Sequence, residues 1–149
     1  MPAPKRRRRG NVVIEFSIAV SLLVTVLAGV WQFGYSFYVY NSLESAVRDG
    51  ARYASLTVYD GGASNGADFH SRVKNMVVYG NPEPDAAALP VVPGLTAEQV
   101  TVTEQFHGAT PERVEVRVED FAIQTIFRTF TLSGKPRCSF AYLGRYTIP

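Results

Sequence analysis

One carboxylate, Glu15, stands at the head of a long apolar stretch and is the side chain of this sequence best placed for chemistry at a molecular contact. Gly10 precedes it, and the five cationic residues before Gly10 are Lys5, Arg6, Arg7, Arg8 and Arg9. A carboxylate within an apolar membrane helix costs roughly 2.5–3.5 kcal/mol, so such residues usually have a specific partner or task. Glu15 therefore indicates an ion-pairing contact, although an acid this close to the arginines could instead reach the lipid headgroups.

The remaining residues do not form a recognisable catalytic or metal-binding motif. His70 and His107 are isolated, and neither stands with Cys138 or a carboxylate at metal-ligand spacing. Residues 60–62 (Asp-Gly-Gly) lack the lysine and following helix of a phosphate-binding loop. Cys138 is the single cysteine, so no disulfide can form within the chain. We expect a protein that is not an enzyme, with no metal site and no cofactor.

The apolar stretch predicts a membrane-spanning helix. Residues 16–43 contain no charged side chain, and at about 1.5 Å per helical residue they exceed the ~30 Å hydrocarbon core. Five of the 15 basic residues precede this stretch, whereas all 13 acidic residues follow Gly10. Because basic residues stay on the cytoplasmic side, we expect a single-pass inner-membrane protein with its N-terminus in the cytoplasm and its C-terminal part outside. The basic run adjoins a membrane segment, so no nucleic-acid partner is expected.

Two other interpretations of the N-terminus remain open. The helix could be a signal anchor that simply stays in the bilayer. It could also be a cleaved secretory signal, because Val26 and Ala28 offer small residues for a cut before Gly29. That cut would leave the aromatic residues between positions 31 and 40 exposed to water without evident cover, which disfavours it.

The helical pattern continues beyond the apolar stretch as an amphipathic stalk. A continuous helix over residues 11–56 would span ~69 Å. One face combines small and apolar residues at helical spacing, so either the chain's own domain or a neighbouring subunit must pack closely against it. Its predicted packing residues are Leu43, Ala46, Val47, Gly50, Ala51 and Ala54. Another face carries Glu44, Arg48 and Arg52 at four-residue intervals.

Residues 57–149 predict one small α+β domain. A second amphipathic helix carries Phe69, Val73, Met76 and Val77 and stops at Gly80. Alternating valines predict a strand over residues 113–119, and further strands are expected over residues 99–106 and 137–146. Residues 122–130 fit a short helix capped by Asp120, with a strand as the alternative. The expected architecture is a long N-terminal helix packed on a small antiparallel sheet, with one or two short helices.

The N-terminal residues resemble the prepilin signal of the type IV pilin superfamily. The resemblance is carried by Arg8-Arg9-Gly10 followed by residues 11–16 (NVVIEF). It implies that a prepilin peptidase cuts between Gly10 and Asn11 on the cytoplasmic face, that Arg6 to Arg9 orient the precursor, and that Glu15 docks the subunit on a neighbour. The chemistry is reasonable, because glycine enters a tight protease cleft without a clash and an amine can neutralise a carboxylate in a low-dielectric bundle.

A narrower resemblance is to the TadE-like minor pilins or pseudopilins of tight-adherence (Tad/Flp) pili. Residues 32–39 (QFGYSFYV) and 46–54 (AVRDGARYA) carry it, with Gln32 and Asp49 where family members often have Glu. The resemblance covers roughly residues 6–56. It implies a pilin-like fold, a role in pilus assembly and adhesion, and as partners a prepilin peptidase, other pilin subunits, the assembly platform and membrane lipid.

The sequence thus divides into a basic leader (1–10), a membrane and stalk helix (11–56) and an exported domain (57–149). The alternative function is that of a signal-anchored cell-envelope protein whose outer domain binds a ligand or acts as a sensor.

Overall fold

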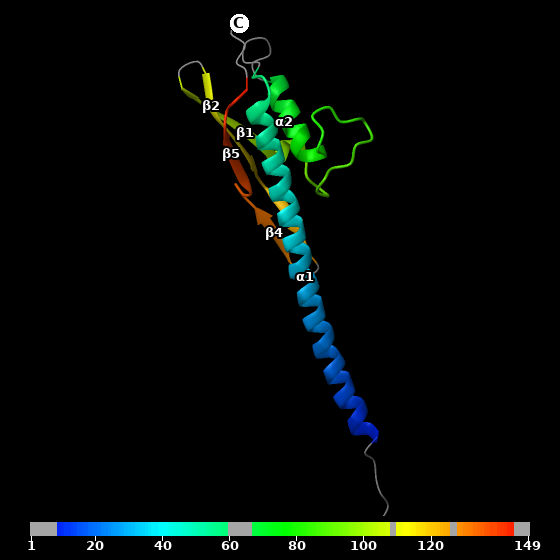
Figure 1. Cartoon of the computed structure of the whole chain (residues 1–149). Coiled ribbons are helices and arrows are strands. Elements are labelled where there is room, and N and C mark those ends of the chain that lie inside the picture. The colour runs from blue at the N-terminus through cyan, green and yellow to red at the C-terminus, as the bar shows by residue number, and fades with distance from the viewer. Residues whose placement is uncertain (1–8, 60–66, 108–109, 126–127, 145–149) are drawn as a thin grey trace, which may run out of the picture. The chain divides into compact units, whose positions relative to one another are not determined.

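The computed structural model describes residues 9–59, 67–107, 110–125 and 128–144. Figure 1 shows the elements, which are α1 (Arg9–Leu56), α2 (Ala67–Tyr79), the 3-10 helix η1 (Ala97–Gln99), β1 (Val100–His107), β2 (Thr110–Val118), β3 (Phe121–Gln124), β4 (Thr129–Leu132) and β5 (Arg137–Ala141). A long apolar helix, small antiparallel sheets and a short second helix confirm the predicted α+β, pilin-like class.

The chain divides into two compact units, Met1–Tyr35 and Ser36–Pro149. The division falls inside α1, so residues 36–56 of this helix belong to the same unit as α2 and all the strands. The apolar residues before position 36 belong to the other unit. Helix α1 contains no proline, and it ends where the amide and hydroxyl groups of Thr57 donate to the carbonyl oxygen of Tyr53 at 3.0 and 2.8 Å.

Helix α2 forms where the amphipathic pattern predicts it. Phe69, Val73 and Val77 are completely buried on its inner face. The helix stops at Gly80, whose φ of 69° is readily available only to glycine and whose amide donates to the carbonyl oxygen of Met76 at 3.0 Å. The glycine-rich connection over residues 60–66 lies outside the described residues.

The three-stranded sheet has the antiparallel order β1-β2-β5. The predicted alternation in β2 is confirmed, since Val114, Val116 and Val118 are completely buried while Arg113 is exposed. The last strand ends at Ala141, earlier than predicted, and residues 145 and 146 of that prediction lie outside the described chain.

The expected short helix over residues 122–130 is wrong, and the alternative of a strand is correct. Strands β3 and β4 pair antiparallel with Ile123 opposite Phe130. Asp120 does not cap a helix but turns the chain with a φ of 54°. Phe121 and Ile123 then alternate into the core, so the pattern has the two-residue period of a strand. Residues 126 and 127 lie outside the described part of the chain.

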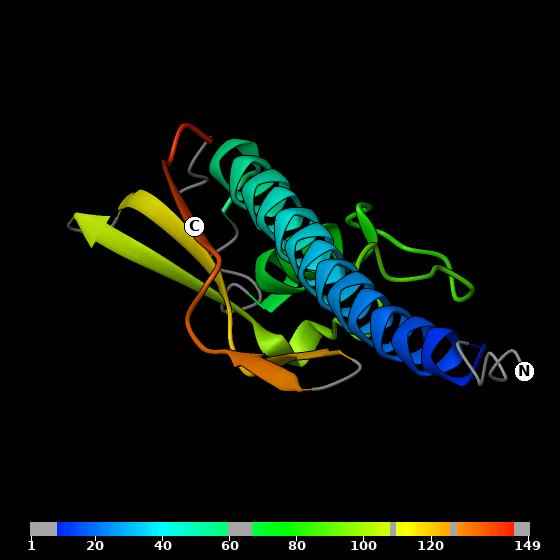
Figure 2. The same ribbon diagram turned by 90° about the horizontal axis from the view of Figure 1, so that it is seen from below.

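One hydrophobic core joins the elements of the unit Ser36–Pro149. It is built from α1, α2, both sheets and the loop before η1, and Figure 2 shows these elements from below. Its buried members are Val39, Leu43, Ala46, Val47, Ala51, Ala54, Phe69, Val73, Val77, Val78, Val92, Leu95, Val100, Val114, Val116, Val118, Phe121 and Ile123.

Polar contacts fasten the chain after β5 to the end of α1. The amide of Leu143 donates to the carbonyl oxygen of Ser55 at 2.9 Å. The hydroxyl of Tyr142 donates to the carbonyl oxygen of Thr57 at 2.8 Å and accepts from the amide of Tyr59 at 2.7 Å. Burial raises the pKa of Tyr142 above 10.0, and the hydrogen bond from Tyr59 partly opposes this.

Candidate assembly interface on the long helix

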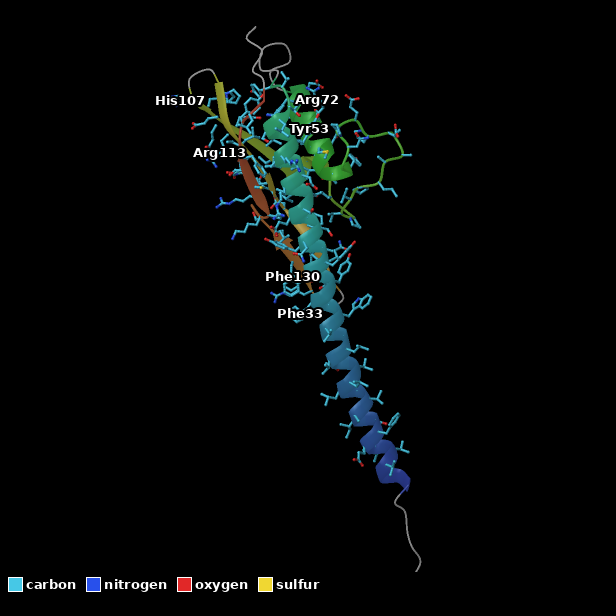
Figure 3. The ribbon with its side chains drawn as sticks, viewed as in Figure 1. Phe33, Tyr53, Arg72, His107, Arg113 and Phe130 are labelled. Atoms are coloured by element: carbon cyan, nitrogen blue, oxygen red, sulfur yellow. The ribbon has the colours of Figure 1, made fainter. Side chains whose placement is uncertain are left out.

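The apolar part of α1 exposes large side chains over the unit Met1–Tyr35. Val13, Phe16, Leu23 and Trp31 are each more than 60% exposed, and Figure 3 labels Phe33, which is 64% exposed. By length and composition α1 is able to cross a membrane, and it is the single such helix among the described residues. An apolar helix surface of this kind needs lipid or other apolar helices around it.

Glu15 is exposed on this apolar surface. No ion pair or hydrogen bond joins its carboxylate to another residue of the described chain. The docking contact expected for Glu15 stays a prediction, and its carboxylate is exposed for such a contact. In a low-dielectric setting a cation supplied by another molecule would neutralise this charge.

A second feature of the same segment was missed from the sequence. The hydroxyl groups of Ser17, Ser21 and Thr25 each donate, at 2.8 Å, to the carbonyl oxygen four residues earlier. These hydroxyls are therefore satisfied within α1, and with Gly29 they form a stripe of small residues. Such stripes let membrane helices approach closely. At about 100° per residue the stripe winds around the helix, from nearly opposite Glu15 at Ser17 to within about 40° of its side at Gly29. Its regular spacing of four was a readable signal.

The six predicted packing residues of the stalk all lie in the core of the unit Ser36–Pro149. Leu43, Val47, Ala51 and Ala54 are completely buried, and Ala46 and Gly50 are buried as well. The cover comes from α2 and other elements of the same chain, because Gly50 lies directly against Val77. The sequence left open whether the chain's own domain or a neighbouring subunit covers this face. In the structure the chain's own domain covers it.

The charged face of the stalk stays in solvent. Arg48 and Glu44 form an ion pair of 2.7 Å whose side chains are 59% and 46% exposed, and Arg52 is also exposed. An exposed pair four residues apart stabilises a helix by only about 0.3–0.5 kcal/mol. This face consequently contributes little to the stability of the fold.

A shallow groove of about 320 Å³ runs between α1, α2 and the loop that follows α2. Its lining mixes the polar residues Ser42, Ser45 and Asp49 with Met76 and Val91. Within the described ranges, no group of three or more histidine, cysteine, aspartate or glutamate residues could hold a metal ion. His70 instead pairs with Glu104 of β1 at 2.5 Å, and His107 is exposed at the end of β1.

The predicted processing site lies where α1 begins. Arg9, Gly10 and Asn11 are in its first turn, where helices fray most readily. Arg6, Arg7 and Arg8 lie outside the described residues.

A family model described as TadE-like protein matches residues 10–52. The match begins at Gly10, contains Glu15, and ends within the buried part of the stalk, so it covers the segment whose motifs indicated this family. No curated protein and no solved structure matches the chain. The apolar helix and the family match together indicate a membrane-anchored protein associated with a Tad pilus. Residues 10–52 of this chain are therefore similar to the TadE-like proteins of the Tad pilus system.

Proposed function

We propose that this chain is a minor pilin or pseudopilin that takes part in assembling a Tad-type pilus and thereby supports surface attachment. Its precursor spans the inner membrane once, with the basic leader in the cytoplasm and residues 57–149 outside. A prepilin peptidase cuts between Gly10 and Asn11. The role is structural and requires no cofactor and no catalysis by this chain.

The observation that carries this proposal is the exposed Glu15 on an otherwise apolar helix surface, without an ionic partner in the described chain. Cleavage after Gly10 would make it the fifth residue and would create a new amino group. Placed beside a neighbouring subunit, the amine of one chain and Glu15 of another neutralise each other in a water-free bundle. The insertion cost of the acid is thus offset only in the assembled state.

The small-residue stripe supports assembly independently. Ser17, Ser21, Thr25 and Gly29 have no large side chains, so another helix can approach α1 closely along this line. A helix that served only as an anchor in lipid would need neither the stripe nor the acid.

Intact-mass measurement of the protein purified from its native membrane tests the processing step. A chain beginning at Asn11, with or without a methyl group, supports the proposal. A chain beginning at Met1 favours the alternative of a signal-anchored envelope protein with a ligand-binding or sensory domain, and one beginning at Gly29 indicates a secretory signal.

Two matched variants sharpen this test. Gly10→Leu should leave a full-length, membrane-bound precursor, because the added side chain blocks access to the protease cleft. Ala28→Leu removes the small residue that a signal peptidase needs and should leave processing unchanged. Mature protein of normal mass from Gly10→Leu, or blocked processing in Ala28→Leu alone, would refute the proposed cut.

A further inference from the structure

The β3–β4 hairpin lies at one end of the unit Ser36–Pro149. This is the end at which residue 36 of α1 begins the unit. At the opposite end, the amide of Leu143, just after β5, donates to the carbonyl oxygen of Ser55. Because β2 and β5 are antiparallel, β2 starts at this far end and finishes at Val118, and β3 follows from Phe121. Figures 1 and 2 agree that β4 lies farther than β1, β2 and β5 from the C-terminal end of α1.

The end of the unit where α1 comes in must meet lipid headgroups. A helix that starts to cross the ~30 Å hydrocarbon core at Phe16, directly after Glu15, leaves it about 20 residues later, near Tyr35. The folded unit begins at the next residue, with no spacer between. On its first turn Phe37 and Tyr38 are 65% and 68% exposed. Aromatic residues in such a position are typical of the membrane–water interface.

The hairpin adds an exposed aromatic ring and a cation at this same end. Phe130 on β4 is 41% exposed, although its cross-strand neighbour Ile123 is buried in the core. The guanidinium carbon of Arg128 lies 6.0 Å from the centre of the Phe130 ring. A ring at the acyl boundary with a guanidinium beside it suits an interface with apolar carbon on one side and phosphate on the other.

We propose that Phe130 and Arg128 are a second membrane contact, which seats the folded unit on the headgroup layer of the leaflet that α1 leaves. Phe130 enters the boundary between headgroups and acyl chains, and Arg128 binds lipid phosphate. Two attachments, the helix and the hairpin, then fix the tilt of the unit on the bilayer. The inference rests on the membrane anchor and is independent of processing or of a role in the pilus.

A single-tryptophan probe tests the contact in the full-length protein reconstituted into phosphatidylglycerol–phosphatidylcholine vesicles. Trp31 is the one tryptophan of the chain, so Trp31→Phe provides a silent background. In that background Phe130→Trp reports on the hairpin, and Phe106→Trp is the matched control on β1. Phe106 is 48% exposed, and Figure 3 places the next residue, His107, at the end of the unit away from Phe130.

If position 130 enters the lipid boundary, its tryptophan should emit at shorter wavelength in vesicles. Its emission should also fall when brominated lipids are present, because they quench tryptophan on contact. The tryptophan at position 106 should show neither effect. Equal responses at the two positions, or a position-130 probe that stays insensitive to brominated lipid, would overturn the contact. A third outcome is a blue shift that brominated lipid does not quench and that disappears as the protein is diluted in lipid. It would show that position 130 contacts a second copy of the chain, and it would also refute the proposal.

Charge reversal tests the role of the cation with the same probe. Arg128→Glu should move the emission of the position-130 probe back towards longer wavelength, because a carboxylate is repelled by lipid phosphate. Arg113→Glu, on an exposed arginine of β2 at the far end, should leave that emission unchanged. The same emission spectrum for Arg128→Glu and Arg113→Glu would exclude a phosphate contact by Arg128.

Discussion

Gly50 of α1 and Val77 of α2 are in such close contact that a Cβ atom built on Gly50 would overlap Cγ2 of Val77. Val77 is completely buried and carries a β-branched side chain, which is stiff in a helix. The missing side chain at position 50 is therefore what allows the two helices to pack. Figure 3 shows the two helices side by side, with Tyr53 on α1 and Arg72 on α2 labelled.

Gly50→Ala should destabilise the folded unit despite the better helix propensity of alanine. The propensity gain is about 1 kcal/mol, whereas overpacking typically costs about 1–3 kcal/mol, so we expect a net loss of up to about 2 kcal/mol. Urea unfolding of the full chain in detergent micelles measures this. Gly34→Ala, where no atom lies within 4 Å of the new Cβ, is the control and should cause no loss. Val77→Ala should relieve part of the defect in the double variant, and simple additivity would contradict the contact.

Truncation of Leu43 and of Leu56, the last two leucines of α1, should distinguish a core position from a surface position. Leu43 is completely buried and Leu56 is 58% exposed. Leu43→Ala should cost about 2–5 kcal/mol, because it leaves a cavity, whereas Leu56→Ala should stay within about 0.5 kcal/mol of the wild type. Thermal unfolding followed by circular dichroism provides the comparison. Similar losses in the two variants would mean that the stalk does not belong to the folded core.

The Tyr142 hydroxyl should make stability sensitive to alkaline pH. Its pKa is raised mainly by burial, so the folded state favours the neutral phenol. The resulting contribution to the free energy of unfolding is fully present below pH 10.0, the pKa of an ordinary tyrosine. It is lost as pH rises through the higher pKa of the folded state. Tyr142→Phe should cost about 1–2 kcal/mol at neutral pH, because Thr57 and Tyr59 lose their partner. It should also show a shallower loss of stability above pH 10.0 than the wild type; parallel curves would exclude Tyr142 as the titrating group.

Replacement of Glu15 should affect assembly rather than membrane retention. Glu15→Leu removes a charge that costs roughly 2.5–3.5 kcal/mol to insert, so the protein should remain in the membrane fraction. Pilus yield, measured by shearing and immunoblotting, should fall because the docking charge is gone. Ser17→Ala is a neighbouring change that keeps the small-residue stripe and should leave yield near the wild-type value. Normal piliation in Glu15→Leu would remove docking from the proposed function.

The sequence predicted the elements with long, unambiguous periods. Helix α2 has three buried residues at helical spacing, and β2 alternates valine with charged residues over most of its length. The stalk face was also readable, because its small residues recur over three turns. The sequence did not show which element covers that face. The covering residues, such as Val77, lie far along the chain, and a contact of this kind leaves no local sequence signal.

The error over residues 122–130 has a physical explanation. Each strand of that hairpin has only four residues, which is too short to distinguish a two-residue period from a helical one. Ala122 and Phe130 share a helical face in the sequence pattern, yet both are exposed on different strands of the hairpin. The left-handed backbone at Asp120, which starts the hairpin, is not encoded by a glycine and gave no warning.

The hydrogen bonds from Leu143 and Tyr142 back to residues 55 and 57 also govern when this protein can finish folding. The partners are separated by more than eighty positions, so the contact order is high and native closure is slow compared with that of a helical hairpin. Before this closure, the central strand β2 has β1 on one edge but lacks β5 on the other. We therefore expect β5 to pair with β2 late in folding, after the local pair of β1 and β2 has formed.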